Sequence, residues 1–434
     1  MKKANNFYEI QDAVAFNNPI DEKDEFYTDF SGFRKGFSEN KIFKLLNINP
    51  KNMECNPLTK PKKIFLSGHR GTGKTTELLK LKNEIDTTTC YLTVFCDLSD
   101  EELDVNNIDF VDIVILILEK LTQTLDTRGI NIPMVNIESF YNWYEERITE
   151  INGRTEESAT IEVEGKIGIS MFSLFSLVSK TKGKLLGSNS TKETIRTTFI
   201  NKFSDFSTKF NEFIFGIKEY LITQKIAQDV LFIIDGFEKI GSLEDRKKIL
   251  IDNSNKFIEI YANMIITLPI ELFSQVSRLN EFSKHISFPL IDLDDQSKEK
   301  FKEFIYKRIN KNLFKNDSNN EEVVLEIIKY GAGSPRETLK IIDNAYIEAE
   351  TELLDMQSIK DAVYVMGEPI VQYLEEDEKD LLKKVYNKEN IFYSDTLANL
   401  LIKKVILEYG DGEDREINPI ILDNINFKEK IEVN

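Results

Sequence analysis

The 434-residue sequence contains few of the side chains that build metal centres and disulfide frameworks: three cysteines, two histidines and one tryptophan. Cys55, Cys90 and Cys96 are too few and too scattered for a disulfide framework or a four-cysteine zinc site, so we expect buried thiols. The histidines are His69 and His285. With two histidines, the sequence offers few candidates for a histidine-based metal site or for a Ser–His–Asp triad.

Long apolar runs are also missing. No stretch reaches the ~18 apolar residues that span a bilayer, and the start MKKANNFYEI lacks the apolar core of a secretion signal. We therefore expect a cytoplasmic protein. The hydrophobic fraction of 41% is ordinary, and the length suffices for two or three packed domains.

Positive charge is in deficit, because 74 acidic residues outnumber 56 Lys and Arg and give a net charge of −18 at pH 7. Such a chain repels nucleic-acid phosphates and anionic membranes as a whole. Any contact with nucleic acid would have to be local.

A glycine-rich loop is the most informative motif. Residues 64–79 read IFLSGHRGTGKTTELL, an apolar strand, a loop and a helix-forming run, which is the context that a phosphate-binding loop requires. Glycines let backbone N–H groups turn toward a phosphate, and the helix start adds its positive dipole end. Lys74 is expected to reach the β- and γ-phosphates, and Thr75 to hold Mg²⁺. The expected nucleotide-binding residues are Gly68, His69, Arg70, Gly71, Thr72, Gly73, Lys74, Thr75 and Thr76.

Four further apolar segments predict strands: CYLTVFCDLSD, VLFIIDGFEKI, NMIITLPIEL and HISFPLIDL. Helical patterns between them favour a five-stranded parallel sheet. Asp235 ends the third strand, where it could hold Mg²⁺ through water. Glu238 could position or deprotonate an attacking water, or could simply favour the first turn of a helix. Thr267, on the fourth strand, could touch the γ-phosphate or the attacking water.

Two regions fall outside this strand pattern. The leader before residue 63 is rich in aromatic residues, and Tyr27, Phe30 and Arg34 are candidates for contact with a base, with ordinary packing as the alternative. From about 131 to 229 the chain departs from alternating strands and helices. Its twelve-residue segment GISMFSLFSLVS could fit a partner groove or a membrane interface, but we favour a hairpin with a loop packed on the core.

The C-terminal third is mostly helical. Pro335 suits a helix start, and Arg336 in that first turn could reach a nucleotide or be a surface charge. From about residue 375, two helical patterns precede VILEYGDGEDREINPIIL, in which Gly-Asp-Gly between short strands predicts a hairpin. Helices followed by a hairpin suggest a winged helix. Its excess of acids favours contact with protein over contact with DNA.

The order of these motifs resembles AAA+ and STAND-type P-loop ATPases that carry a helical lid and a C-terminal winged helix, as in initiator and signal-transduction ATPases. The resemblance runs from about residue 24 to 422. It implies an α/β fold: a P-loop NTPase core with a five-stranded parallel sheet, a helical lid and a winged helix. The implied division is a leader at 1–60 that could cover the adenine, a core at 61–293 with an insertion at about 131–229, a lid at 294–373 and a winged helix at 374–434.

The resemblance also implies roles for single residues. Asp235 corresponds to the Walker B acid, Thr267 to the sensor 1 position, and Arg336 of GSPR to sensor 2. Arg278 lies in the interval where AAA+ proteins carry an arginine finger that completes a neighbour's site.

One departure bears on the rate of hydrolysis. Most AAA+ enzymes carry a glutamate directly after the Walker B aspartate, where this chain has Gly236. A small residue there and an acid at the third following position, here Glu238, are typical of STAND members. We therefore expect slow hydrolysis.

These patterns together predict an ATP- and Mg²⁺-dependent conformational or assembly switch, with a protein partner or further copies of the chain, in microbial signalling or defence. ATP is preferred to GTP because no guanine-reading motif follows the Walker B strand. One alternative is an initiator-like ATPase that contacts DNA through the lysine pairs at 383–384 and 403–404. Another is a scaffold that holds nucleotide without turnover. A small-molecule kinase would have no clear use for the lid and tail.

Overall fold

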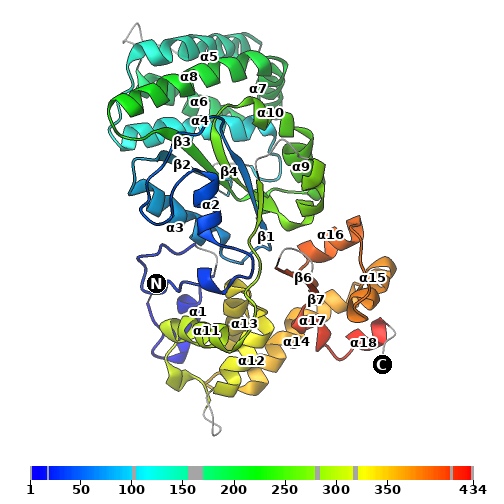
Figure 1. Cartoon of the computed structure of the whole chain (residues 1–434). Helices are drawn as coiled ribbons and strands as arrows, with labels where there is room; N and C mark the ends of the chain where they lie inside the picture. The colour runs from blue at the N-terminus through cyan, green and yellow to red at the C-terminus, as the bar shows by residue number, and fades with distance from the viewer. Residues whose placement is uncertain are drawn as a thin grey trace.

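A computed structural model describes residues 2–16, 19–99, 104–154, 170–278, 284–315, 321–410 and 414–431. A five-stranded parallel sheet in the order β2-β3-β4-β1-β5 forms its centre (Figure 1). The predicted α/β fold with a P-loop NTPase core is confirmed. The strands are β1 (Lys63–Gly68), β2 (Tyr91–Asp97), β3 (Asp229–Asp235), β4 (Asn263–Pro269) and β5 (Lys284–Ser287).

Helices cover both faces of the sheet, as a parallel sheet requires. Successive side chains of a strand point to opposite faces, so Ile64 and Leu66 of β1 enter one core and Phe65 enters the other. The first core includes residues of α2 and α3, and the second includes α4. These helices are α2 (Glu39–Leu45), α3 (Lys74–Asp86) and α4 (Phe110–Thr127).

Four helices between α4 and β3 form a bundle at one end of the molecule, far from α11–α14 in Figure 1. They are α5 (Met134–Arg154), α6 (Met171–Leu185), α7 (Asn189–Asn201) and α8 (Phe203–Thr223). The segment GISMFSLFSLVS, predicted to form a hairpin, is helical in α6, so that prediction is wrong for residues 171–179. Ser170 caps this helix by accepting the N–H of Ser173 at 3.1 Å, and Leu174 and Val178 are buried. Residues 155–169 lie outside the description.

An aromatic cluster fills this helical bundle. The ring of Trp143, the single tryptophan, lies 5.7 Å from Phe206 and 6.1 Å from Phe199. Phe140 stacks on Phe213 with centroids 5.0 Å apart. These rings, in edge and stacked contacts, are continuous with the core between α4 and the sheet.

Shorter elements complete the sheet layer. Between β3 and β4 lie a 3₁₀ turn (Phe237–Lys239), α9 (Leu243–Lys247), a π-helical turn (Lys248–Asp252) and α10 (Ser254–Glu259). A longer 3₁₀ segment, Ile270–Arg278, follows β4. The leader contains the 3₁₀ turns Phe7–Glu9 and Ser31–Phe33 and the short α1 (Ile10–Ala13).

Four helices after β5 pack with the start of the chain. They are α11 (Asp295–Arg308), α12 (Glu321–Gly331), α13 (Pro335–Glu348) and α14 (Met356–Gln372), with a 3₁₀ turn at Lys311–Leu313. Ala4, Phe7 and Ile10 share a core with Phe301 and Ile305. The leader therefore joins the helices that follow the sheet, although some 290 residues separate them.

The C-terminal segment contains the predicted antiparallel hairpin, β6 (Ile406–Tyr409) with β7 (Asp414–Ile417). Residues 411–413 of its turn lie outside the description. Helices flank it: α15 (Glu376–Tyr386), α16 (Asp395–Ile402), α17 (Pro419–Leu422) and α18 (Phe427–Lys430). Among the described residues, no helix has both the length and the apolar character needed to cross a membrane.

The cysteines differ from the expectation of three thiols. Cys55 and Cys90 form a disulfide, with Cα atoms 5.7 Å apart, that joins the segment after α2 to the chain just before β2. Cys96 is free and buried, as expected. The prediction is wrong for the pair because 35 residues separate the two cysteines and only the tertiary fold makes them neighbours.

Candidate functional site

The glycine-rich loop wraps around its own lysine. Gly71 and Gly73 have φ values of +89° and +96°, the left-handed region that favours glycine. The helix α3 begins at Lys74, whose Nζ donates to the carbonyls of Gly68 and His69 at 2.9 Å each. The loop is therefore preformed around a buried cation at the carboxyl end of β1.

Asp235 lies at the carboxyl end of β3, beside the loop. The Thr75 hydroxyl donates to Asp235 Oδ2 at 2.5 Å. The other oxygen, Oδ1, is buried and has no hydrogen-bond partner among the described residues. Burial, followed by the charge of nearby Glu238, raises the pKa of Asp235 to about 6.

These two side chains fit Mg²⁺. A magnesium site uses one or two carboxylates and completes its shell with phosphate oxygens and water. Thr75 and the unsatisfied Asp235 oxygen offer such hard oxygen ligands. No cluster of three or more His, Cys, Asp or Glu side chains suited to a metal occurs in the described part of the chain.

Glu238 lines the same cavity from the turn after β3. Its Oε2 is buried without a hydrogen-bond partner within the described ranges. Burial alone would raise the pKa of Glu238, but the charge of Lys74 and other favourable contacts outweigh it and leave the pKa below its usual value. The carboxylate therefore stays ionised and free to accept a hydrogen bond.

The turn between Asp235 and Glu238 depends on glycine. Gly236 has φ +100°, and a Cβ there would lie 3.3 Å from Asp97 Oδ1 and 3.3 Å from Leu98. The Gly236 N–H donates to the Thr267 hydroxyl at 3.1 Å. Thr267 is fully buried and is absent from the cavity lining, so its hydroxyl holds the turn that presents Glu238.

The helix α13 meets the loop directly. Ser334 caps it by accepting the N–H of Glu337, and Pro335 occupies its first position. The Ser334 hydroxyl donates to the Gly71 carbonyl at 3.1 Å. The Arg336 side chain crosses Gly71 so closely that a Cβ there would lie 3.0 Å from Arg336 Cβ. Burial lowers the pKa of Arg336, which lines the cavity.

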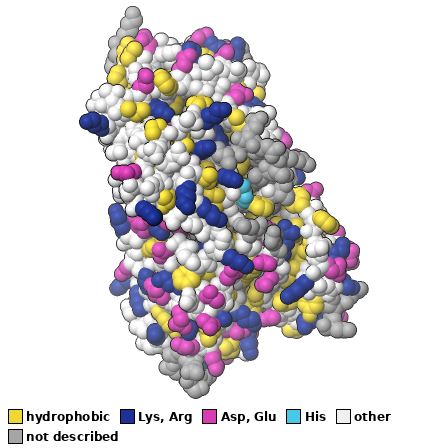
Figure 2. Space-filling view, viewed as in Figure 1, with side chains coloured by type: hydrophobic (Ala, Val, Ile, Leu, Met, Phe, Trp, Pro, Cys, Tyr) yellow, Lys and Arg dark blue, Asp and Glu magenta, His cyan; other side chains and the backbone are white. Residues whose placement is uncertain are grey.

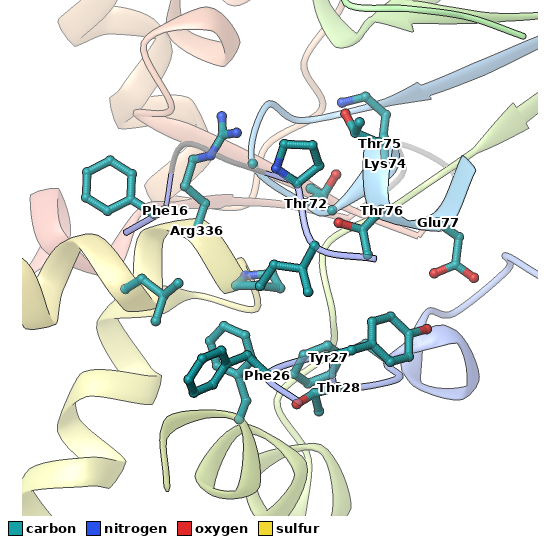
Figure 3. A pocket seen from close by; sticks show the side chains of 18 of the residues that line it. Phe16, Phe26, Tyr27, Thr28, Thr72, Lys74, Thr75, Thr76, Glu77 and Arg336 are labelled. Atoms are coloured by element: carbon teal, nitrogen blue, oxygen red, sulfur yellow. The ribbon is translucent and has the colours of Figure 1, made fainter. Parts of the chain in front are cut away.

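The leader forms the opposite wall, where Phe26, Tyr27 and Thr28 lie across the cavity from Thr72 and Thr76 (Figure 3). The hydroxyls of Tyr27 and Thr28 are buried, and the described residues offer them no hydrogen-bond partner. The leader side chains are thus positioned to contact a molecule between the walls.

The three predicted leader residues all line this cavity. Phe30 also packs on Phe301 with ring centroids 4.7 Å apart. The Arg34 side chain makes several contacts within the protein. Its guanidinium donates to the carbonyls of Thr72 and Pro289 and lies 4.0 Å from the Phe288 ring centroid. These contacts fix the loop through Arg34.

Several lining residues carried no local signal in the sequence. They come from the leader and from α11 and α13, far apart along the chain, and include Phe16, Phe26, Thr28, Phe304, Arg308 and Leu339. The aromatic content of the leader was the feature of the sequence that indicated a binding surface there. Their convergence depends on the packing of the leader against α11–α14.

The remaining loop residues have different surroundings. Thr76 lines the cavity, whereas Arg70 is exposed and points to a separate cavity described below. His69 is buried, and its Nε2 accepts the backbone N–H of Glu408 in β6 at 2.9 Å. Burial, then the charges of Lys404 and Lys74, lower the pKa of His69 to about 3, so the ring remains a neutral acceptor. The side chain of Arg278 lies outside the described residues.

Comparisons with known proteins give distant matches in structure alone. No family model and no curated protein matches the chain. A Walker-type ATPase of Pyrococcus abyssi is 13% identical with a TM-score of 0.44, covering 97% of this chain and 100% of that one. The RuvB Holliday junction branch migration motor of Thermotoga maritima is 10% identical with a TM-score of 0.31 (86% and 88% covered). The ORC1 protein of Aeropyrum pernix, solved with DNA, is 12% identical with a TM-score of 0.32 (94% and 95% covered).

These neighbours are P-loop ATPases, and likenesses this distant carry no argument about activity. The fold assignment therefore depends on the sheet and on the loop after β1.

Proposed function

We propose that this chain is a nucleotide-controlled switch that binds ATP with Mg²⁺ and hydrolyses it slowly. The observation that carries the proposal is the convergence of separate parts of the chain on one loop. Gly71 accepts a hydrogen bond from Ser334 of the helical segment, and His69 accepts one from Glu408 of the C-terminal hairpin. Through these contacts, a conformational change of the loop at the phosphate site can alter the positions of both the helical segment and the C-terminal hairpin.

The proposed division of the chain follows the sequence boundaries. It has a leader at 1–60, an ATPase core at 61–293 with a helical insertion at about 131–229, a lid at 294–373 and a winged helix at 374–434. Within the helical segment α11–α14, the start of α13 contacts the loop where a lid would close. The helices α15 and α16 followed by the β6–β7 hairpin match the order of elements in a winged helix.

In the proposed mechanism, Lys74 exchanges its two carbonyl contacts for the β- and γ-phosphates of ATP. Mg²⁺, held by Thr75 and Asp235, would neutralise charge on the phosphates. Glu238 positions the attacking water, because phosphoryl transfer needs an oriented nucleophile more than a strong one. Arg336 stabilises the charge that develops on the γ-phosphate. Thr267 acts indirectly, because its hydroxyl holds the Gly236 turn.

Opening is part of this proposal. The cavity holds about 130 Å³, well below the roughly 300 to 1,000 Å³ of common ligand clefts. A nucleotide therefore enters when the leader and α13 separate from the loop, and its contacts with both walls favour closure again. Binding and domain movement are thereby linked.

One observation favours a second candidate, a scaffold that holds nucleotide without turnover. Gly236 occupies the position at which most AAA+ enzymes carry the catalytic glutamate, and its φ of +100° disfavours a side chain there. In this candidate Glu238 would only balance the charges of Lys74 and Arg70.

The experiment that tests the switch is phosphate release measured together with size-resolved mass, with and without ATP and Mg²⁺. We expect slow release and an ATP-dependent change in mass or shape for the wild type, both absent in Lys74→Ala. Lys82→Ala, on the same helix but paired with Asp86, is the matched control and should behave as the wild type. Tight ATP binding with no release and no change in mass or shape would instead favour the scaffold.

A further inference from the structure

A second cavity lies between α13, α14, α16 and α17 and holds about 460 Å³. Its volume falls within the roughly 300 to 1,000 Å³ of small-molecule sites. Five cations line it: Arg70, Arg336, Lys340, Lys403 and Lys404. We call it the basic cavity. Such a concentration of positive charge stands out in a chain with a net charge of −18.

Acidic side chains compensate only part of this charge. Glu337 is the one acid among the described residues that line the basic cavity, and it pairs with both Lys404 and Lys340. Lys403 pairs with Glu378 at 2.6 Å. These two carboxylates pair with the three lysines, whereas the two arginines have no ion pair with a described residue and are attracted by the nearby charge of Glu238.

The unpaired positive charge in the basic cavity belongs to the two arginines. In the described part of the chain, neither Arg70 nor Arg336 has a carboxylate within ion-pair distance, and their charges repel each other. Burial, followed by the repulsion of Lys340 and Arg336, lowers the pKa of Lys404 to about 8 despite its contact with Glu337. A bound anion would relieve this repulsion.

We propose that the basic cavity is a second ligand site, distinct from the P-loop cavity, that binds a small molecule carrying two or more phosphate groups. Arginine presents a planar fork of N–H donors that matches phosphate, and lysine adds point charges. Five lining cations, two of them arginines without an ion pair to any described residue, suit a di- or triphosphate better than a single carboxylate. Met366, Ile370 and Ile402 supply apolar surface that could contact the rest of the ligand.

A small ligand fits these observations better than a nucleic acid. A nucleic acid requires a basic stripe along which several phosphates are neutralised. The basic charge here is confined to a cavity. Figure 2 shows Lys and Arg interspersed with Asp and Glu over the viewed face.

The position of the site gives it a regulatory role. Arg70 comes from the P-loop, Lys340 from α13 and Lys403 from the segment before β6, so one ligand would join three parts of the chain. Arg336 lines both cavities. Occupancy of the basic cavity would hold the C-terminal segment against the loop and alter the nucleotide site.

The test is calorimetric titration of inorganic tripolyphosphate and of ATP into the full chain carrying Lys74→Ala, which weakens the P-loop site. We expect one molecule bound per chain, and at least tenfold weaker binding when Lys340→Gln and Lys403→Gln are added. The matched control adds Lys360→Gln and Lys428→Gln, two exposed lysines outside the cavity, and should change affinity less than twofold. Tighter binding of ATP would identify the ligand as a nucleotide, and equal affinities a polyphosphate without a base.

Because Lys403 pairs with a buried glutamate, Lys340→Gln alone serves as a second variant if the double substitution unfolds, as judged by circular dichroism. The single variant should weaken binding at least threefold. The proposal is overturned if neither probe binds, or if binding does not depend on Lys340 and Lys403. Lysine-dependent binding of a single-stranded oligonucleotide, with no binding of tripolyphosphate, would overturn it in favour of nucleic acid.

Discussion

Asp235 and Glu238 lie three residues apart, yet their surroundings shift their pKa values in opposite directions. Burial raises the pKa of Asp235 to about 6, whereas the charge of Lys74 helps to hold that of Glu238 below its usual value. Two acids separated in this way can take different roles at one site. The proposed roles are a metal ligand for Asp235 and a water-positioning group for Glu238.

The Glu238 role predicts a trapped nucleotide. Glu238→Gln keeps the size of the side chain and removes its charge, so ATP should still bind while phosphate release falls at least tenfold. Retained ATP is measured by chromatography of the denatured protein, and turnover by phosphate release. Glu244→Gln, an exposed acid nearby, should leave both unchanged. Wild-type turnover in Glu238→Gln would refute the assignment.

The Asp235 pKa predicts a pH dependence. Because the pKa is raised, the carboxyl binds a proton below about pH 6, where an ordinary aspartate would remain ionised. A metal competes with that proton, so the gain in ATP affinity that Mg²⁺ provides should fall by up to about tenfold per pH unit below about pH 6. Titrations of the wild type and Asp235→Asn separate this effect from protonation of ATP itself. Identical pH profiles for the two proteins would contradict it.

At the scale of elements, the helical bundle α5–α8 contains an aromatic cluster in which Phe206 contacts several other rings. The ring of Phe206 is fully buried and contacts those of Phe140, Trp143 and Phe199 at 5.7 to 6.1 Å between centroids. The stability of the bundle should therefore depend strongly on this one side chain.

Phe206→Ala should lower the free energy of unfolding by about 3 to 5 kcal/mol, the usual cost of removing a buried phenylalanine. Phe215→Ala is the matched control, because Phe215 lies on the same helix with its side chain 59% exposed, and should change stability by less than about 0.5 kcal/mol. Urea unfolding followed by circular dichroism measures both. Equal losses would show that burial in this cluster does not govern stability.

The elements were predictable where local sequence decides them. The strands and the helix at Lys74 follow from apolar runs and the glycine loop, and all five strands form the sheet. The helix α6 was missed because serines interrupt an apolar run, although Met171, Leu174 and Val178 are spaced for one buried helical face.

The residues of the candidate site also fall into two groups: those that local motifs predict, and those that only the tertiary fold brings together. Lys74, Thr75 and Asp235 follow from motifs that place them at the carboxyl ends of two strands, and the structure brings them together. The leader wall, the Cys55–Cys90 disulfide and the contact of His69 with β6 join residues far apart in the chain. No local pattern in a single sequence encodes such pairings, so the tertiary fold alone reveals them.

At the scale of the whole molecule, the P-loop is the meeting point of distant segments. Within about nine residues it contacts the leader through Thr72, α13 through Gly71 and the C-terminal hairpin through His69. The hairpin contact spans 339 residues of sequence. It should respond to a change in one side chain of the loop.

His69→Ala removes the acceptor of the Glu408 amide, so hydrogen exchange at that amide should accelerate at least tenfold. Exchange in α15, which the loop does not contact through this residue, serves as the control within the same experiment. Mass spectrometry of peptides from residues 404–410 and 376–386 reads both. Unchanged protection of the Glu408 amide would show that other contacts dock the hairpin.

The single tryptophan gives the molecule a selective optical label. Trp143 lies in the aromatic core of α5–α8, and no other residue of the chain has an indole. Its emission spectrum therefore reports on the helical bundle and is blind to direct contact at the P-loop cavity. A change in tryptophan emission when ATP is added would accordingly be a signal transmitted through the fold, readable in the unmodified protein without an attached dye.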